Sequence, residues 1–316
     1  MPRILVAGGA GFIGSHFVDL MLSRESTQKI IVLDSLTYAG NMKNLQINDS
    51  RFSFVHDDIC NKQTVDELLL QVDVVVNFAA ESHVDKSILD SKQFVTTNIV
   101  GTHVLLDASL RNNIKKYVQV STDEVYGSID VGSWDENSLI QPNSPYSASK
   151  ASGDLLVKSF YKTYGLHTNI TRCSNNFGPR QFPEKIIPFF ISRLNMGLQI
   201  PIYGDGKNIR DWLHVTDHCR AIEMVLNNGD PGEIYNVGGG VELDNLTLAK
   251  KLISLLDAPM SALSFVPDRK GHDQRYSVDW SKINKLLGYS PTMDFEASLK
   301  QTINWYRDNP RWWNFE

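Results

Sequence analysis

A glycine-rich turn between a short apolar run and a helical pattern constrains the fold more than any other feature of this 316-residue chain. Arg3–Ala7 has the composition of a buried strand, the segment GGAGFIG begins at Gly8, and Phe12–Ser23 has a helical pattern. Such a turn lets the backbone approach a phosphate, whose charge is stabilised by free N–H groups at the helix N-terminus. The spacing of Gly8, Gly11 and Gly14 is one residue wider than GxGxxG, and by itself it also fits a purely structural turn.

The first half of the chain repeats this alternation of strand and helix patterns. Repeated βαβ units predict an α/β fold, here a Rossmann-like, doubly wound parallel sheet with helices on both faces. The predicted strands are Arg3–Ala7, Lys29–Leu33, Phe52–Val55, Val72–Phe78, Tyr117–Ser121 and Thr168–Arg172. The predicted helices are Phe12–Ser23, Lys62–Gln71, Lys86–Asn112 and Tyr146–Tyr164.

The pattern changes after about Cys173, where prolines cluster. A smaller, irregular C-terminal α/β domain is expected there, and it would form a ligand cleft with the first domain. Its predicted helices are Leu246–Leu256, Ser281–Leu287 and Phe295–Asn309.

The charge and cysteine content exclude several classes of protein. The chain has 31 Lys and Arg against 36 Asp and Glu, a net charge of −5, and no basic run, so nucleic acids and anionic membranes are poor partners. No apolar stretch approaches the ~18 residues that cross a bilayer. The three cysteines are scattered without a CxxC pair, which argues against disulfides and a metal site and favours a reduced, cytoplasmic protein.

Asp34 points to the identity of the cofactor. It ends the segment IIVLD about 20 residues after the glycines, where a carboxylate binds a ribose 2′-OH and repels a 2′-phosphate. NAD is therefore predicted, with Gly8, Gly11, Phe12, Ile13, Gly14 and Asp34 among its contacts. Asp34 could instead be a helix cap or a turn residue.

Two motifs carry candidate catalytic groups. In YSASK, Tyr146 and Lys150 lie four residues apart and share a helix face, so the ammonium of Lys150 is expected to lower the pKa of Tyr146 and favour a basic phenolate. A surface Tyr–Lys pair is the alternative. In STDEVYG, Asp123 and Glu124 follow the fifth predicted strand. A carboxylate pair suits elimination of water, because repulsion raises one pKa enough for that group to keep a proton. The alternative is that the pair only caps the next turn.

Together, GGAGFIG, STDEVYG and YSASK resemble the extended short-chain dehydrogenase/reductase superfamily. The Asp–Glu pair and the stretches NFAAESHVDKSI, RCSNNFGPRQFPEKIIP, YGDGKNIRDWLHVTDH and DRKGHDQRYSVDW are similar to the dTDP-glucose 4,6-dehydratases over nearly the whole chain. This resemblance implies an NAD-dependent hydro-lyase that makes dTDP-4-keto-6-deoxyglucose and water from dTDP-glucose. C4 would be oxidised, water lost across C5 and C6, and hydride returned to C6.

The resemblance also implies a role for each catalytic residue. Tyr146, assisted by Lys150, would take the proton of the sugar 4-OH, and Thr122 would hydrogen-bond the C4 oxygen. Glu124 would remove the C5 proton, and Asp123 would protonate the C6 oxygen.

Further contacts are implied by position in the family motifs. The additional cofactor contacts would be Asp58, Ile59, Ala79, Ala80, Ser82, Thr97, Ser121, Tyr146, Lys150 and Asn176. The substrate contacts would be Ser82, His83, Thr122, Asn175, Lys185, Arg210, Asn245, Arg269 and His272. Arg210 and Arg269 could chelate a diphosphate, although each could instead form a salt bridge with the adjacent Asp211 or Asp268.

Domain limits and assembly follow from the same resemblance. An NAD-binding domain would comprise residues 1–176 plus about 208–238, and a nucleotide-sugar domain about 177–207 plus 239–316. Lys86–Asn112 and Tyr146–Tyr164 would pair in a four-helix bundle to form a homodimer.

Two alternatives remain for the function. They are another nucleotide-sugar enzyme, such as a UDP-glucose 4-epimerase or a decarboxylase, and a non-catalytic NAD-sensing protein. The short connection of 18 residues between Gly127 and Tyr146 resembles the versions found in natural-product deoxysugar pathways.

Overall fold

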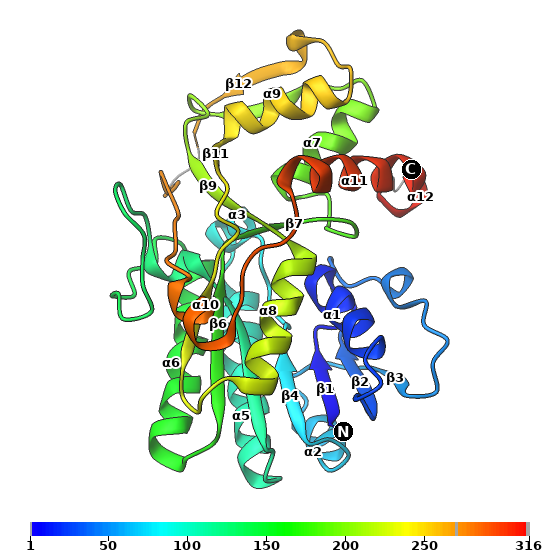
Figure 1. The fold of residues 1–316 in the computed structure, drawn as a ribbon, viewed down its shortest axis with the longest axis vertical. Coiled ribbons are helices and arrows are strands. Elements are labelled where there is room, and N and C mark those ends of the chain that lie inside the picture. The colour runs from blue at the N-terminus through cyan, green and yellow to red at the C-terminus, as the bar shows by residue number, and fades with distance from the viewer. Residues whose placement is uncertain (1, 269–270, 314–316) are drawn as a thin grey trace.

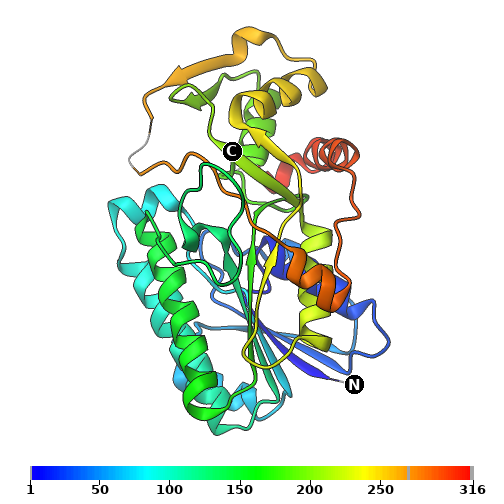
Figure 2. The same ribbon diagram turned by 60° about the vertical axis from the view of Figure 1, so that its left-hand side comes forward.

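The computed structural model describes residues 2–268 and 271–313. A large lobe built on a parallel sheet lies below a smaller α/β lobe in the view of Figure 1, and the two remain distinct when the molecule is turned in Figure 2. The sheet has seven strands in the order β10-β6-β5-β4-β1-β2-β3, and every neighbouring pair is parallel. The strands are β1 (Arg3–Ala7), β2 (Lys29–Asp34), β3 (Phe52–His56), β4 (Val74–Asn77), β5 (Lys116–Thr122), β6 (Thr168–Cys173) and β10 (Ile234–Val237).

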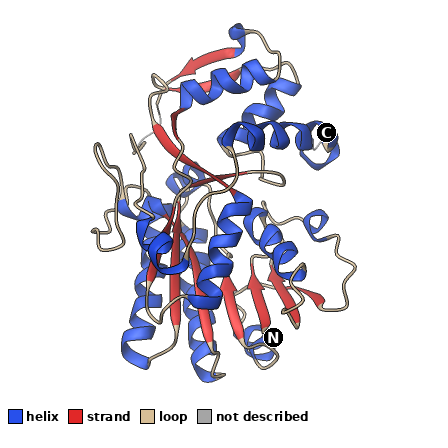
Figure 3. Cartoon of the chain, viewed as in Figure 1, coloured by secondary structure: helices blue, strands red, loops and turns tan. Residues whose placement is uncertain are grey.

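Helices cover both faces of this sheet, as Figure 3 shows. In β1, Ile4 and Val6 belong to one core with residues of α1 (Phe12–Leu22) and α8 (Val215–Asn228). Leu5 and Ala7 belong to a second core with residues of α2 (Lys62–Leu69), α5 (Thr102–Arg111) and α6 (Pro145–Tyr164). Successive strand residues point to opposite faces, so a continuously apolar strand is what two covered faces require. The predicted doubly wound fold is confirmed.

The prediction of one long helix over Lys86–Asn112 is wrong. The segment forms α3 (Val84–Leu89), α4 (Lys92–Val95), a π-helical turn at Thr96–Gly101 and then α5. Asp90 has extended backbone at the first break, and its Oδ1 accepts a hydrogen bond from the N–H of Lys92 at 3.0 Å. A short acidic side chain that bonds the backbone two residues ahead competes with helix continuation.

The small lobe has a core of its own, formed largely by α7 (Ile186–Asn195), α9 (Asn245–Leu255) and α11 (Phe295–Asp308). Its strands are β7 (Asn175–Phe177), β8 (Ile200–Tyr203), β9 (Ile209–His214), β11 (Glu242–Asp244) and β12 (Leu263–Val266), which form two small sheets. The short helices α10 (Ser281–Leu287) and α12 (Pro310–Trp313) follow later in the chain.

The sequence did not predict α7, α8 or β10. The sequence does not indicate α7 because Pro188 suggests a break. In the structure Pro188 lies in the first turn of α7, where a missing N–H costs no intrahelical bond. The helices predicted near Leu246, at Ser281 and at Phe295 are confirmed within one residue at each end.

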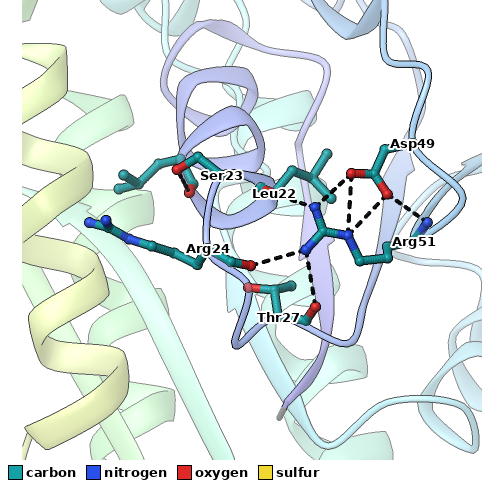
Figure 4. A network of polar contacts seen from close by, with 7 residues as sticks. Leu22, Ser23, Arg24, Thr27, Asp49 and Arg51 are labelled. Atoms are coloured by element: carbon teal, nitrogen blue, oxygen red, sulfur yellow. Dashed lines mark hydrogen bonds and ion pairs between the residues drawn. The ribbon is translucent and has the colours of Figure 1, made fainter.

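Arg51 anchors the long β2–β3 connection to the end of α1 (Figure 4). Its guanidinium donates to the carbonyl oxygens of Leu22 at 2.5 Å, Arg24 at 3.0 Å and Thr27 at 3.3 Å, and it pairs with Asp49 at 2.6 Å. A cation at the last carbonyls of a helix is favourable electrostatically and satisfies acceptors that lack intrahelical donors. Among the described residues, none of the helices is both long and apolar enough to span a bilayer.

Candidate active site

The glycine-rich turn forms a cradle whose backbone segments approach too closely for a side chain at Gly8 or Gly14. Gly8 has φ of 76°, and a Cβ there would lie 2.5 Å from the backbone nitrogen of Ala79. A Cβ on Gly14 would lie 2.3 Å from the carbonyl oxygen of Gly8. Gly11 begins α1 without a side-chain cap, and the first turn carries no acidic residue. Exposed N–H groups at a positive helix end fit a pyrophosphate, so the turn suits the dinucleotide that the sequence predicted.

Asp34 lies at the carboxyl end of β2, beside this turn. Its Oδ2 accepts a hydrogen bond from the N–H of Ala10 at 2.8 Å, and its Oδ1 accepts one from Leu36 at 2.8 Å. Asp34 is therefore a turn residue, which was the alternative interpretation. Each carboxylate oxygen can accept more than one hydrogen bond, so binding a ribose hydroxyl remains compatible with this role. Burial raises the pKa of the Asp34 carboxyl.

The other predicted cofactor residues are spread along the carboxyl ends of the strands. Ala79 and Ala80 follow β4, directly against Gly8. Asp58 is exposed after β3, and the buried Ile59 packs beneath Gly101. Thr97 lies in the π-helical turn.

The two candidate catalytic carboxylates, Asp123 and Glu124, begin a single 3₁₀ turn (Asp123–Tyr126) at the end of β5. Thr122 caps this turn by accepting a hydrogen bond from the N–H of Glu124 at 3.3 Å, and its hydroxyl donates to Asp123 Oδ1 at 3.2 Å. Asp123 is 3% exposed, and its Oδ2 has no hydrogen-bond partner among the described residues. Burial, and then the carboxylate of Glu124, raise the pKa of Asp123 well above its usual range. A raised pKa favours the protonated carboxyl of Asp123, which is the form that a general acid needs.

Tyr146 and Lys150 lie in the first turns of α6, whose start is set by a capping box between Ser144 and Ser147. Both side chains are buried, and Lys150 Nζ donates to the carbonyl oxygen of Val120 at 2.8 Å. Burial, and then the carboxylate of Glu124, raise the pKa of Tyr146 well above its usual range. The expectation that Lys150 lowers this pKa is wrong for the structure described here, because desolvation and nearby carboxylates favour the neutral phenol.

A second cluster joins the two lobes near Ser82. Lys185 Nζ donates to the carbonyl oxygen of Ser82 at 2.7 Å, and His83 Nε2 lies 3.6 Å from Glu184 Oε2. The hydroxyl of Tyr38 donates to Glu184 Oε1 at 3.0 Å and lies 3.1 Å from Ser82 Oγ. Sequence reasoning missed Tyr38 and Glu184. Glu184 directly precedes the predicted substrate contact Lys185, so its position in the sequence could have identified it. No local motif identifies Tyr38.

Arg210, on β9, is 5% exposed, and its guanidinium stacks on the ring of Tyr276 at 4.4 Å. It donates to the carbonyl oxygen of Asp273 at 2.9 Å, while Asp211 accepts from the N–H groups of Gly239 and Val241 instead. His272 Nδ1 lies 2.6 Å from Asp268 Oδ1. Asn245 begins α9, beside β9. Arg269 lies outside the described residues.

Several buried polar atoms in this region lack a partner among the described residues. They are Ser121 Oγ, Asp123 Oδ2 and Asn175 Oδ1. Leaving such groups unpaired costs about 1–3 kcal/mol each. All three follow or end the adjacent strands β5 and β6, where parallel sheets bind ligands, so they are suited to contact a cofactor or substrate. Asn176 is held differently, because its Oδ1 lies 2.9 Å from His218 Nδ1 and its Nδ2 donates to Ser174.

Known proteins resemble this chain over nearly its full length. Residues 5–302 match the family described as GDP-mannose 4,6 dehydratase. A dTDP-glucose 4,6-dehydratase of Actinoplanes sp. is 54% identical, covering 98% of this chain and 99% of its own. DesIV, a dTDP-glucose 4,6-dehydratase of Streptomyces venezuelae crystallised with NAD, superposes with a TM-score of 0.98 at 51% identity and 99% coverage of both chains.

A UDP-glucose 4-epimerase of Thermotoga maritima is more distant, with 30% identity and a TM-score of 0.91 over 98% of this chain and 99% of its own. The resemblance inferred from the sequence motifs is thus confirmed. The chain belongs to the dTDP-glucose 4,6-dehydratase family.

Proposed function

We propose that this protein is an NAD-dependent hydro-lyase that converts dTDP-glucose to dTDP-4-keto-6-deoxyglucose and water. The observation that carries the proposal is the pairing of a buried Asp123, whose pKa is raised, with Glu124 at the carboxyl end of β5. One carboxyl group that keeps its proton beside another that can accept one is the arrangement that elimination of water needs. The identities of about 50% to dTDP-glucose 4,6-dehydratases support the substrate.

The glycine-rich turn, Asp34 and the strand ends at Ala79 and Ser121 would hold the dinucleotide. Bound NAD⁺ would supply the hydride acceptor for oxidation at C4 and, once reduced, the hydride donor for C6. A cation bound beside the phenol would lower the raised pKa of Tyr146, because a nearby positive charge favours the phenolate. Tyr146 would then accept the proton of the 4-OH, while Thr122 orients the C4 oxygen.

Elimination would use the two carboxyl groups in opposite roles. Once C4 is a ketone, the C5 proton is acidic and Glu124 would remove it. Asp123 would donate its proton to the C6 oxygen, which leaves as water. Hydride delivered to C6 and a proton returned to C5 would then complete the 4-keto-6-deoxy product. The buried, unpartnered Oδ2 of Asp123 and the raised pKa of this carboxyl suit a proton donor. Each proton transfer of this kind contributes about 10²–10⁴-fold to the rate.

The test is the double variant Asp123→Asn with Glu124→Gln, assayed with dTDP-glucose. We expect formation of the 4-keto-6-deoxy product to fall by at least about 10²-fold, while C4 oxidation survives. Glu67→Gln, on the exposed surface of α2, is the matched control. Near wild-type product formation by the double variant would refute the assignment.

The wild-type enzyme should also be incubated with dTDP-, UDP- and CDP-glucose. The 4-keto product absorbs in alkali, and NMR shows whether C6 has lost its oxygen. A product that retains the C6 oxygen would instead identify an epimerase.

We further propose a homodimer formed through a four-helix bundle of the segments 86–112 and 146–164. Apolar side chains on these segments are exposed in the single chain, including Val95, Val100 and Leu155 at 46%, 47% and 54%. Burying such side chains against a second copy would remove them from water.

We also propose that the two lobes correspond to two domains, one of residues 1–176 plus about 208–238 and the other of about 177–207 plus 239–316. The free thiols of all three cysteines suit a cytoplasmic location.

A further inference from the structure

A hydrogen-bonded bridge connects the small lobe to the glycine-rich turn of the large lobe. Trp312, on α12, donates from Nε1 to Asn44 Oδ1 at 3.0 Å. Asn44 Nδ2 then donates to the carbonyl oxygen of Ala10 at 2.9 Å. Asn44 lies in a 3₁₀ turn (Met42–Leu45) of the β2–β3 connection. A tryptophan 268 residues away along the chain thus contacts the cofactor cradle through one amide side chain.

Further hydrogen bonds fix the backbone around Ala10, which this bridge reaches. The carbonyl oxygen of Ala10 also accepts from the N–H of Asn41 at 3.1 Å, and the N–H of Ala10 donates to Asp34 Oδ2 at 2.8 Å. The N–H of Gly11 donates to the carbonyl oxygen of Gly8 at 3.3 Å. Because Gly11 is the N-cap residue of α1, the orientation of the Ala10–Gly11 peptide sets the direction of the first-turn N–H groups.

Only one orientation of the Asn44 amide satisfies both neighbours. Asn44 is 2% exposed. If its amide were rotated by 180°, its NH₂ group would face the indole N–H of Trp312, and its oxygen would face the carbonyl oxygen of Ala10. Unmade hydrogen bonds in a buried site carry the full desolvation cost. The indole N–H of Trp312 therefore selects the amide orientation that holds Ala10.

Trp312 is itself fixed within the small lobe. Its side chain is 8% exposed, and its ring packs against Trp305 at 5.1 Å and Tyr306 at 6.2 Å between centroids. The hydroxyl of Tyr306 donates to the carbonyl oxygen of Gln181, in the segment that follows β7. Displacement of Trp312 would thus require movement of an aromatic cluster rather than of one side chain.

Arg180 provides a second tie between the same regions. Its guanidinium donates to the carbonyl oxygen of Asn44 at 3.3 Å and pairs with Asp19 of α1 at 2.7 Å. The 3₁₀ turn that carries Asn44 is therefore held by the small lobe, by α1 and by the segment after β7.

We propose that Trp312 is a positioning residue for the dinucleotide, acting through Asn44 to hold the Ala10–Gly11 peptide in the orientation that directs the N–H groups of α1 at the pyrophosphate. The proposal rests on the proposed function, because it assumes that NAD occupies this cradle. The bridge does not include Asp123, Glu124 or Tyr146. Its loss should therefore weaken retention of NAD without changing proton transfer at those residues.

The experiment compares Trp312→Phe with Trp305→Phe. Both variants remove an indole N–H from the same aromatic cluster, and only the first removes the bond to Asn44. NAD release is followed after the holoenzyme is diluted into an enzymatic NAD trap. We expect Trp312→Phe to release NAD about 3- to 10-fold faster, the effect of one lost hydrogen bond, and Trp305→Phe to behave as wild type. Saturating NAD should restore kcat, with KM for dTDP-glucose unchanged.

A double-mutant cycle with Asn44→Asp tests the route of the effect. A carboxylate at this position cannot donate to Ala10, so Asn44→Asp alone should also speed NAD release, and adding Trp312→Phe should change it no further. This second variant keeps the proposal testable if one protein fails to fold. The proposal would be overturned if Trp312→Phe released NAD at the wild-type rate. It would also be overturned if the effects of Trp312→Phe and Asn44→Asp on NAD release were additive. A wild-type protein that binds no NAD would instead overturn the proposed function.

Discussion

The guanidinium of Arg172 lies 2.9 Å from Asp154 Oδ2 in an ion pair whose side chains are 1% and 0% exposed. The pair joins the helix of Tyr146 and Lys150 to β6, and the guanidinium also stacks on the ring of Tyr126 at 4.7 Å. Asp154 lies one helical turn after Lys150, where its charge partly offsets the lowering of the Lys150 pKa by burial. The ion pair thus holds a negative charge near Lys150 inside the protein.

Removal of one partner of this pair should be costly. Arg172→Met leaves Asp154 buried without its cation, and we expect a loss of about 3–5 kcal/mol in the free energy of unfolding. Urea denaturation of the purified variants measures it. Adding Asp154→Leu to Arg172→Met should recover much of the stability, because no buried charge remains. A double variant as unstable as the single would contradict this account.

Asp123→Asn should stabilise the protein at neutral pH. The folded-state pKa of Asp123 is raised, so its carboxyl favours folding fully only below the unfolded pKa of about 3.9, and that contribution is lost as the pH rises toward the folded pKa. The amide does not titrate. We therefore expect the Tm difference from wild type to be near zero at pH 3.5 and to grow in favour of the variant toward pH 7. A constant difference across this range would show that burial of the charge is not its cause.

His218 should make the protein sensitive to acid. Burial lowers its pKa to about 3, and its Nδ1 lies 2.9 Å from Asn176 Oδ1. A depressed pKa gives stability that is present above the unfolded pKa of about 6.5 and lost progressively as the pH falls toward 3. The expected slope is at most about 1.4 kcal/mol per pH unit. His218→Gln should flatten this dependence between pH 6.5 and 4.5 in urea titrations, and an unchanged slope would contradict the assignment.

Leu155→Glu should dissociate the proposed dimer. A charge at the centre of an apolar interface is desolvated without a partner, so we expect the variant to elute as a monomer in size-exclusion chromatography with light scattering. Leu70→Glu is the control, since Leu70 is 73% exposed at the end of α2, outside the proposed bundle. A Leu155→Glu protein that remains dimeric would place the interface elsewhere.

The sequence predicted the secondary structure correctly where interactions between residues close in the chain determine it. The strand, glycine turn and helix at Arg3–Leu22 follow from residue order alone, because apolar runs, glycine geometry and helical periodicity act over a few residues. The helix predicted over Tyr146–Tyr164 likewise differs from α6 (Pro145–Tyr164) by only one residue. Where helix patterns continued without an obvious stop, as at Asp90, the prediction failed, since a single side-chain hydrogen bond decided the break.

The amino-acid sequence by itself determined the βαβ order and the glycine-rich turn, and it predicted Asp123, Glu124, Tyr146 and Lys150 as candidate catalytic residues. Only the tertiary structure decided the directions in which the pKa values of Asp123, Tyr146 and Lys150 shift. Desolvation and long-range charges set the pKa of Asp123 and Tyr146, and both depend on which distant segments cover a side chain. The contact between Trp312 and Asn44 is of the same kind, because no local pattern shows which indole will reach a given amide once two lobes have packed.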